Sequence, residues 1–276
     1  MNMFKKAFVA MLLVSTSAYA QNKVSLSGSD TLGGVMTDAI IAAGMNQKIS
    51  YTGGGSSVGE KAFVNGEISI TAMSREMKPE VLAQARAAGV EPVAHVVALD
   101  GIGLFVNASN LVASFDLPTL AKIFTCEYTA WNQVPNSGKS GAIKAYRRND
   151  QSGTTDTFKA LVGVKTFGAC VTVVNETADI ADRTATDADA IGYAGLSGIK
   201  AGNRDVAISA TAASAAITPN TATIRDGSYP LSRKLYIYSA SGVRAPAGAE
   251  QELLEYLLDR SFLDPIVQDH DFVTLD

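Results

Sequence analysis

Residues 24–44 read VSLSGSDTLGGVMTDAIIAAG and predict a strand, a short turn and a helix. Val24–Ser27 has the alternation of a strand, Gly28–Thr31 (GSDT) forms the turn, and the helical pattern covers about Gly34–Gly44. The same order recurs along the chain, where short apolar runs alternate with helical patterns as far as the last helix at Ala249–Arg260. This alternation predicts an α/β fold whose mostly parallel sheets are covered by helices on both sides.

The composition narrows the classes of protein that need to be considered. The chain has 276 residues, of which 47% are apolar and 18% charged, and its formal net charge is −4. It is too apolar to be disordered and long enough for one large or two medium domains. The acidic balance argues against nucleic acid as a partner. Because there are only two His and two Cys, we expect no metal site and no cofactor.

The first 20 residues have the pattern of a secretory signal peptide. A lysine pair precedes the apolar stretch Ala7–Val14, and Ala18–Ala20 supplies an A-x-A cleavage site. The apolar stretch is too short to span a bilayer, which disfavours the alternative of an N-terminal membrane anchor. We therefore expect an exported protein in an oxidising compartment. There Cys126 and Cys170 can form a disulfide or remain as two buried thiols.

Three strand-to-helix connections carry glycine and hydroxyl residues: Gly28–Thr31, Gly53–Ser57 (GGGSS) and Asp150–Thr155 (DQSGTT). A helix N-terminus offers backbone N–H groups without internal partners and the positive end of the helix dipole. Glycine lets these groups approach a ligand, and Ser or Thr adds donors, so such a turn can bind an anion. One turn alone is more simply an ordinary N-cap. Three of them, with Arg147–Arg148 just before the third, predict a site for an oxyanion.

In this order the motifs resemble those of the periplasmic phosphate-binding proteins of high-affinity phosphate ABC transporters. The matching stretches span nearly the whole mature chain: Ser27–Leu32 (SGSDTL), Tyr51–Ser57 (YTGGGSS), Leu99–Asn107 (LDGIGLFVN), Arg147–Thr154 (RRNDQSGT), Ala190–Tyr193 (AIGY) and Tyr229–Tyr238 (YPLSRKLYIY). The resemblance implies the type II periplasmic-binding-protein fold, in which two crossover strands join two lobes. Here lobe 1 is expected to comprise residues 21–104 and 236–276, and lobe 2 residues 105–235.

The resemblance also implies what the protein does. It implies a binding protein and not an enzyme, a monomer that holds inorganic phosphate between its lobes and delivers it to an ABC permease of the inner membrane. Two alternatives remain within this class. The ligand can be another tetrahedral oxyanion, such as sulfate, molybdate or arsenate, or the protein can serve adhesion or signalling instead of uptake.

Matched position by position, the motifs imply the anion-binding residues Thr31, Leu32, Ser56, Arg75, Arg148, Ser152, Gly153 and Thr154. Asp150 is expected to fix the Arg148 guanidinium from behind. Arg75 departs from the family's common pattern, which has at this point an Asp that accepts a proton from phosphate and so rejects sulfate. Asp30 is a substitute acceptor, although a turn or cap role is the simpler assignment for it.

An enzyme alternative also follows from the second turn. Gly55–Gly59 (GSSVG) fits the G-x-S-x-G pattern of a nucleophile elbow, with Ser57 as nucleophile and His95 or His270 as base. The glycine lead-in suits the approach of an anion better than a nucleophile, and a five-residue pattern is common by chance. A serine hydrolase is therefore the less favoured hypothesis.

Overall fold

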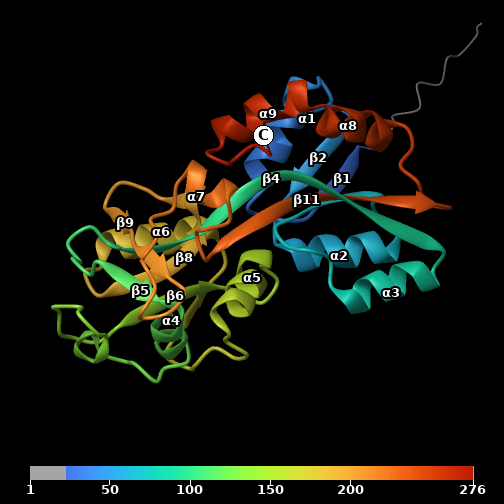
Figure 1. Ribbon diagram of the computed structural model, residues 1–276. Coiled ribbons are helices and arrows are strands. Elements are labelled where there is room, and N and C mark those ends of the chain that lie inside the picture. Colours follow the sequence, from blue (N-terminus) through green and yellow to red (C-terminus); the bar gives the residue numbers. More distant parts are fainter. Residues whose placement is uncertain (1–22, 276) are drawn as a thin grey trace, which may run out of the picture.

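The computed structural model describes residues 23–275, and the predicted signal peptide at residues 1–20 lies outside the described residues. The helices and strands are grouped around two hydrophobic cores (Figure 1). The first core is formed by buried residues between Leu26 and Ala98 and between Leu235 and Phe272. The second is formed by buried residues between Ile102 and Leu231, together with Val273. We call the two halves the first and the second lobe.

The first lobe has helices on both sides of its strands (Figure 1). Strands β1 and β2 pair in parallel, and the side with α1, α8 and α9 lies opposite the side with α2 and α3. Its elements are β1 (Val24–Ser27), α1 (Gly33–Ala42), β2 (Ile49–Thr52), α2 (Ser56–Asn65), β3 (Ile70–Met73), α3 (Pro79–Ala87), α8 (Ala249–Leu258) and α9 (Arg260–Asp269).

The second lobe contains more strands than the first. Strand β6 pairs in parallel with β7 and β8, and β5 pairs in parallel with β10. Its elements are β5 (Ser114–Asp116), α4 (Leu117–Phe124), β6 (Lys144–Arg148), α5 (Gly153–Val162), β7 (Thr172–Val174), α6 (Thr177–Thr186), β8 (Ala190–Gly195), β9 (Asn203–Asp205), β10 (Ala207–Ser209) and α7 (Thr221–Arg225), with 3-10 turns at Trp131–Gln133 and Leu196–Gly198.

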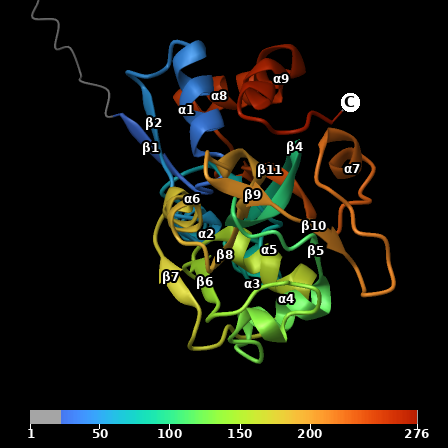
Figure 2. The same ribbon diagram turned by 90° about the vertical axis from the view of Figure 1, so that its left-hand side faces the viewer.

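Two long strands join the lobes. β4 (Val90–Asn107) and β11 (Ser232–Gly242) run side by side from one lobe toward the other (Figures 1 and 2). Both pair antiparallel with all their neighbours, so the sheet continues between the lobes in the order β3-β11-β4-β8-β6-β7, with β9 on β4. The predicted fold class is confirmed, but the strand pairing is less parallel than expected because of these two strands.

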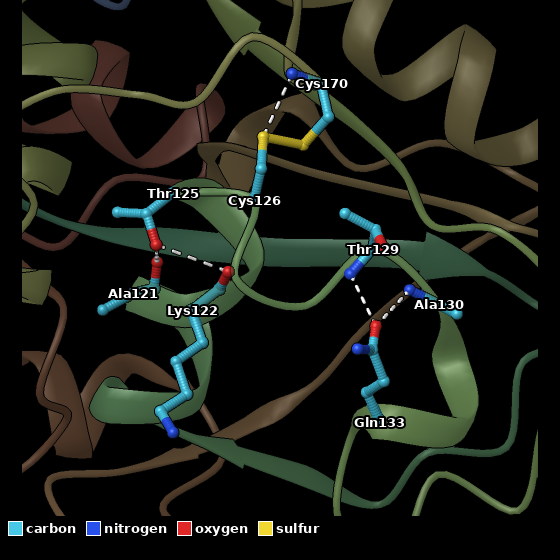
Figure 3. Close-up of a disulfide and its surroundings, with 8 residues drawn as sticks. All are labelled: Ala121, Lys122, Thr125, Cys126, Thr129, Ala130, Gln133 and Cys170. Carbon is cyan, nitrogen blue, oxygen red and sulfur yellow. Dashed lines mark hydrogen bonds between the residues drawn. A yellow bond between two sulfur atoms is a disulfide. The ribbon is translucent and has the colours of Figure 1, made fainter.

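Cys126 and Cys170 form a disulfide in the second lobe, with an S–S distance of 2.01 Å (Figure 3). It joins the end of α4 to the loop before β7, where the Cys170 N–H donates to the Cys126 sulfur at 3.0 Å. A Cβ atom on Gly168 would lie 2.2 Å from that sulfur, so the loop passes the disulfide only because this residue is glycine. Of the two alternatives for these cysteines, the structure contains the disulfide.

Candidate anion-binding site

The three glycine–hydroxyl turns meet where the two lobes touch. The first two turns are joined within the first lobe, because the Gly55 N–H donates to the Gly28 carbonyl at 3.0 Å. The second turn meets the third across the lobes, where the Ser57 N–H donates to the Gln151 carbonyl at 3.2 Å. Gly55 has a φ of 121°, and a Cβ there would lie 2.2 Å from that same carbonyl oxygen. Only glycine permits so close an approach.

Polar groups predicted for the site come together at this contact. The hydroxyl oxygens of Thr31 and Thr154, from opposite lobes, are 3.1 Å apart. Ser56 is fully buried, and a Cβ on Gly153 would lie 2.3 Å from its hydroxyl oxygen. The structure therefore brings two predicted residues of the first lobe together with two of the second lobe that lie more than 90 positions later in the chain.

Three helices begin at this contact, namely α1 at Gly33, α2 at Ser56 and α5 at Gly153. Leu32 is the N-cap residue of α1, and its side chain is buried in the first core, so only its backbone can meet a ligand. Ser152 is the N-cap residue of α5, where its hydroxyl oxygen accepts from the Thr155 N–H at 3.3 Å. Ser152 thus has the ordinary capping role that such residues prefer.

A chain of hydrogen bonds fixes the start of α5 against β6 and β8. The Thr155 hydroxyl donates to the Arg148 carbonyl at 3.2 Å, and the Tyr193 hydroxyl donates to the Thr155 oxygen at 3.0 Å. Burial raises the pKa of Tyr193 well above its ordinary value, so its phenol stays protonated and keeps donating. The first turn of α5 is held in one orientation as a result.

Arg148 supplies the buried positive charge of the site. Its side chain is 3% exposed, and its Nη1 donates to the Asp30 carboxylate at 2.5 Å and to the Thr177 hydroxyl at 2.8 Å. Its Nε is buried and has no hydrogen-bond partner among the described residues. Leaving a buried donor unpaired costs about 1–3 kcal/mol, and more for a charged group. The guanidinium therefore has an N–H available for an acceptor.

The prediction for Asp150 is wrong. Its carboxylate accepts from Arg147 Nη1 at 2.8 Å and has no contact with Arg148. Successive side chains of a strand point to opposite faces, so Arg147 lies away from its neighbour, with its guanidinium 4.6 Å from the Phe167 ring centroid. The carboxylate beside Arg148 is Asp30, which reaches it from the first lobe. Asp30 therefore has a role beyond that of a turn residue.

Arg75 does not join the other predicted residues. Its Nε donates to Asp156 at 2.9 Å, and its two Nη groups donate to both oxygens of Glu60, to the Ser57 hydroxyl and to the Glu76 carbonyl. A guanidinium has five N–H donors, and all five are used by the protein. Burial lowers the pKa of Arg75, and the two carboxylates raise it by more. Arg75 is an ion-pairing residue between the lobes instead of an anion ligand.

The described residues give no support to the hydrolase alternative. Neither histidine hydrogen-bonds Ser57, since His95 contacts the Ser239 hydroxyl at 2.9 Å and His270 contacts the Asp38 carboxylate at 2.8 Å. An elbow serine needs an imidazole within hydrogen-bond reach as its base. Across residues 23–275 there is also no group of three His, Cys, Asp or Glu side chains placed to hold a metal ion.

The sequence motifs do not predict a role in this region for Arg233 and Asp100. They lie opposite each other on β11 and β4, and Arg233 Nε and Nη2 donate to one Asp100 oxygen at 2.9 and 2.6 Å. Burial raises the pKa of Asp100, while Arg233 and two backbone N–H groups oppose that rise. Each of the two crossover motifs contains one of these charges, Asp100 in the first and Arg233 in the second, and this is the only hint in the sequence. That the two residues pair becomes visible only in the fold.

A model of the PBP superfamily domain matches residues 13–261. The chain belongs to the PBP superfamily. The match spans both lobes and both crossover strands, and it confirms the predicted family relationship. Within the described part of the chain, no helix has the length and the apolar content that crossing a membrane requires.

Three proteins of known name or structure are similar to this chain, and the names of two of them refer to phosphate. The phosphate-binding protein PstS of Pseudomonas aeruginosa is 27% identical over an alignment of 264 residues, which covers 89% of this chain and 81% of that protein. Protein SphX of Synechococcus elongatus is 30% identical over 222 residues, 77% of this chain and 66% of that protein. A solved structure from Clostridium perfringens, assigned as a phosphate ABC transporter substrate-binding protein with bound phosphate, matches with a TM-score of 0.79 and 25% identity over 92% of this chain and 100% of that one.

Proposed function

We propose that this PBP superfamily member binds inorganic phosphate between its lobes, without chemical change, and delivers it to an ABC permease of the inner membrane. The observation that carries this proposal is the buried Arg148 guanidinium, whose Nε–H has no partner among the described residues and whose partner Asp30 lies in one of the three turns that meet at the starts of α1, α2 and α5. Helix N-termini and buried guanidinium groups are the two structures that proteins use most to bind small oxyanions. The phosphate-bound Clostridium structure and the relative PstS support phosphate as the ligand.

Each lobe supplies part of the site in this proposal. Thr31, the Leu32 backbone and Ser56 donate from the first lobe, and Gly153 and Thr154 donate from the second. Arg148 supplies the charge, and Ser152 holds the first turn of α5. We assign the lobe boundaries to the stretches between Ala98 and Ile102 and between Leu231 and Leu235, a few residues from the predicted bounds at 104 and 235. We assign the protein to the periplasm and the functional state to a monomer.

The anion acts by joining the lobes. Because donors from both lobes converge on one small ligand, binding favours the arrangement in which the lobes are in contact. Thr31 and Thr154 show how close the opposing donors come in that arrangement, at 3.1 Å. The permease would then recognise the closed form, which is the one whose population rises with phosphate.

Asp30 is the proposed basis of selectivity. Its carboxylate lies 2.5 Å from Arg148 Nη1 and 3.1 Å from the Thr177 hydroxyl, on the first-lobe side of the site. Phosphate carries a proton at neutral pH and can donate it to a carboxylate. Sulfate has no proton to donate and would meet repulsion between like charges. Asp30 therefore takes the role of the carboxylate that the family commonly has where this chain has Arg75.

Calorimetric titration with phosphate, sulfate, arsenate and molybdate tests the function. We expect micromolar or tighter binding of phosphate and a loss of at least tenfold in Arg148→Ala, since hydrogen bonds to charged groups are worth about 1.5–3 kcal/mol. Arg147→Ala is the matched control, because it removes the same charge from the opposite face of β6. If no oxyanion binds, or if the two variants lose affinity equally, the proposed site is wrong.

The role of Asp30 has its own test. We expect Asp30→Asn to bring the affinities for sulfate and phosphate closer together, because an amide can donate to sulfate and no longer repels it. Asp38→Asn is the control, as Asp38 is an exposed first-lobe carboxylate paired with His270. An unchanged ratio of the two affinities in Asp30→Asn would show that Asp30 does not determine selectivity. The proposal that phosphate binds at this site would not be affected.

A further inference from the structure

Arg233 and Asp100 form an ion pair at the place where the crossover strands pass between the lobes. Their side chains are 3% and 2% exposed, and their positions are directly opposite in the β4–β11 register. Charged groups this deeply buried are tolerated only when paired, so the guanidinium has one fixed orientation.

The free edge of this guanidinium faces the two threonines of the anion site. Nη1 donates to the Thr154 hydroxyl oxygen at 2.7 Å, and Nη2 lies 3.4 Å from the Thr31 hydroxyl oxygen. The threonines come from opposite lobes, and Arg233 comes from a strand that belongs to both. Arg233 is therefore in contact with both halves of the site at once.

These contacts determine which way the hydroxyl groups can act. A hydroxyl group has one O–H donor and oxygen lone pairs that accept. When Arg233 donates to the Thr154 oxygen, the Thr154 O–H points elsewhere and is available to donate. An oxyanion offers only acceptors on its unprotonated oxygens, so a hydroxyl group already oriented as a donor binds it with less loss of freedom.

We infer that Arg233 is a positioning residue of the anion site. Held by Asp100 on the crossover strands, it orients the hydroxyl groups of Thr31 and Thr154 as donors and links both lobes in the closed form. The inference rests on the proposed function, because it assigns Arg233 to that same site. It differs from the role of Arg148, since Arg233 acts through the threonines, while its Nε and one Nη2 N–H are held by Asp100.

A double-mutant cycle with phosphate tests the inference. Arg233→Lys keeps the positive charge beside Asp100 but loses the planar fork, so the fold is retained while the contact with Thr154 is not. We expect about a tenfold loss of phosphate affinity in Arg233→Lys and a similar loss in Thr154→Val. If Arg233 acts in part through the Thr154 hydroxyl, the loss of affinity in the double variant should be clearly smaller than the two single losses combined.

The outcomes separate a positioning role from a structural one. Arg204→Lys is the control, because Arg204 donates only to backbone carbonyls of the second lobe, at Asn110, Val112 and Asp205, and should change Tm without changing affinity. Losses that add in the double variant, or an Arg233→Lys protein with unchanged affinity, would overturn the inference while leaving the phosphate site intact. If the unmodified protein binds no oxyanion, the proposed function and this inference fail together.

Discussion

In the first lobe the turns of the site lie directly against neighbouring backbone, whereas in the second lobe aromatic side chains hold them. A Cβ on Gly28 would lie 2.4 Å from the Ala72 carbonyl oxygen, and one on Gly59 would lie 2.8 Å from the Gly28 Cα. In the second lobe, the Phe158 and Tyr193 rings stack with their centroids 3.9 Å apart, under the turn that carries Thr154. We therefore expect substitutions that enlarge a side chain to destabilise the first lobe, and substitutions that shorten a side chain to destabilise the second.

The largest effect is expected from Phe158→Ala. The side chain is fully buried on α5, with a second ring contact to Phe124 at 4.9 Å. Truncation leaves a cavity beneath the site and should lower the free energy of unfolding by about 3–5 kcal/mol in urea denaturation. Phe262→Ala in the first lobe, where the ring is only partly buried, should lose less. Equal losses in the two variants would contradict the proposed importance of the aromatic stack.

Removing the disulfide should have the next largest effect and should act on the second lobe alone. Cys126 and Cys170 enclose a loop with a sequence separation of 44, and the chain has no other cysteine. Replacing both by Ser should cost about 2–4 kcal/mol, mainly because the unfolded chain becomes less constrained. Hydrogen exchange should accelerate in α4 and around β7 but not in α1 or α2. A uniform acceleration over both lobes would mean that the lobes do not differ as proposed.

Gly59→Ala tests the first lobe by adding one carbon. The new Cβ would lie 2.2 Å from the Thr71 hydroxyl oxygen and 2.8 Å from backbone of the first turn, so α2 must shift. Overpacking of this kind costs about 1–3 kcal/mol. Gly33→Ala is the control, since its Cβ would have ordinary contact distances and Ala favours the helix. A Gly59→Ala protein as stable as the control would show that the backbone contact is looser than we describe.

The same contrast explains what the sequence could predict. Glycine–hydroxyl turns and helix starts depend on neighbouring residues, so the sequence predicts the three turns and the arginine pair just before the third. Ion-pair partners depend on the fold. Asp150 is two positions from Arg148, but it lies in the turn after β6 and pairs with Arg147, while Asp30, 118 positions away, makes the contact.

The other misses have the same physical origin. Arg75 matched an anion position in the motif, but Glu60 and Asp156 use all its donors, and nothing local to Arg75 indicates that they would. Arg233 and Asp100 are 133 positions apart and meet only because β4 and β11 pair. In each case the sequence predicts the strand, helix or turn on which the charged residue lies. It does not predict which residue of opposite charge pairs with it.

The smallest expected effect is a pH dependence confined to the first lobe, where both histidines of the chain lie. Burial lowers the pKa of His95 below its ordinary value of 6.5, so the folded protein favours the neutral imidazole. Its contribution to stability is fully present above pH 6.5 and is lost as the pH falls through the folded pKa. Tm measured from pH 7.5 to pH 5 should therefore fall less in His95→Gln than in the unmodified protein.

The matched variant for this last prediction is Ser239→Ala, which removes the hydroxyl 2.9 Å from His95 Nε2 and leaves the burial unchanged. Since burial is the cause of the lowered pKa, Ser239→Ala should keep the pH dependence that His95→Gln loses. If Ser239→Ala loses it as well, the hydrogen bond and not burial controls the titration. In that case the first lobe, like the second, would depend on a side-chain contact at this position, and the contrast between the lobes would apply only to the turns of the site.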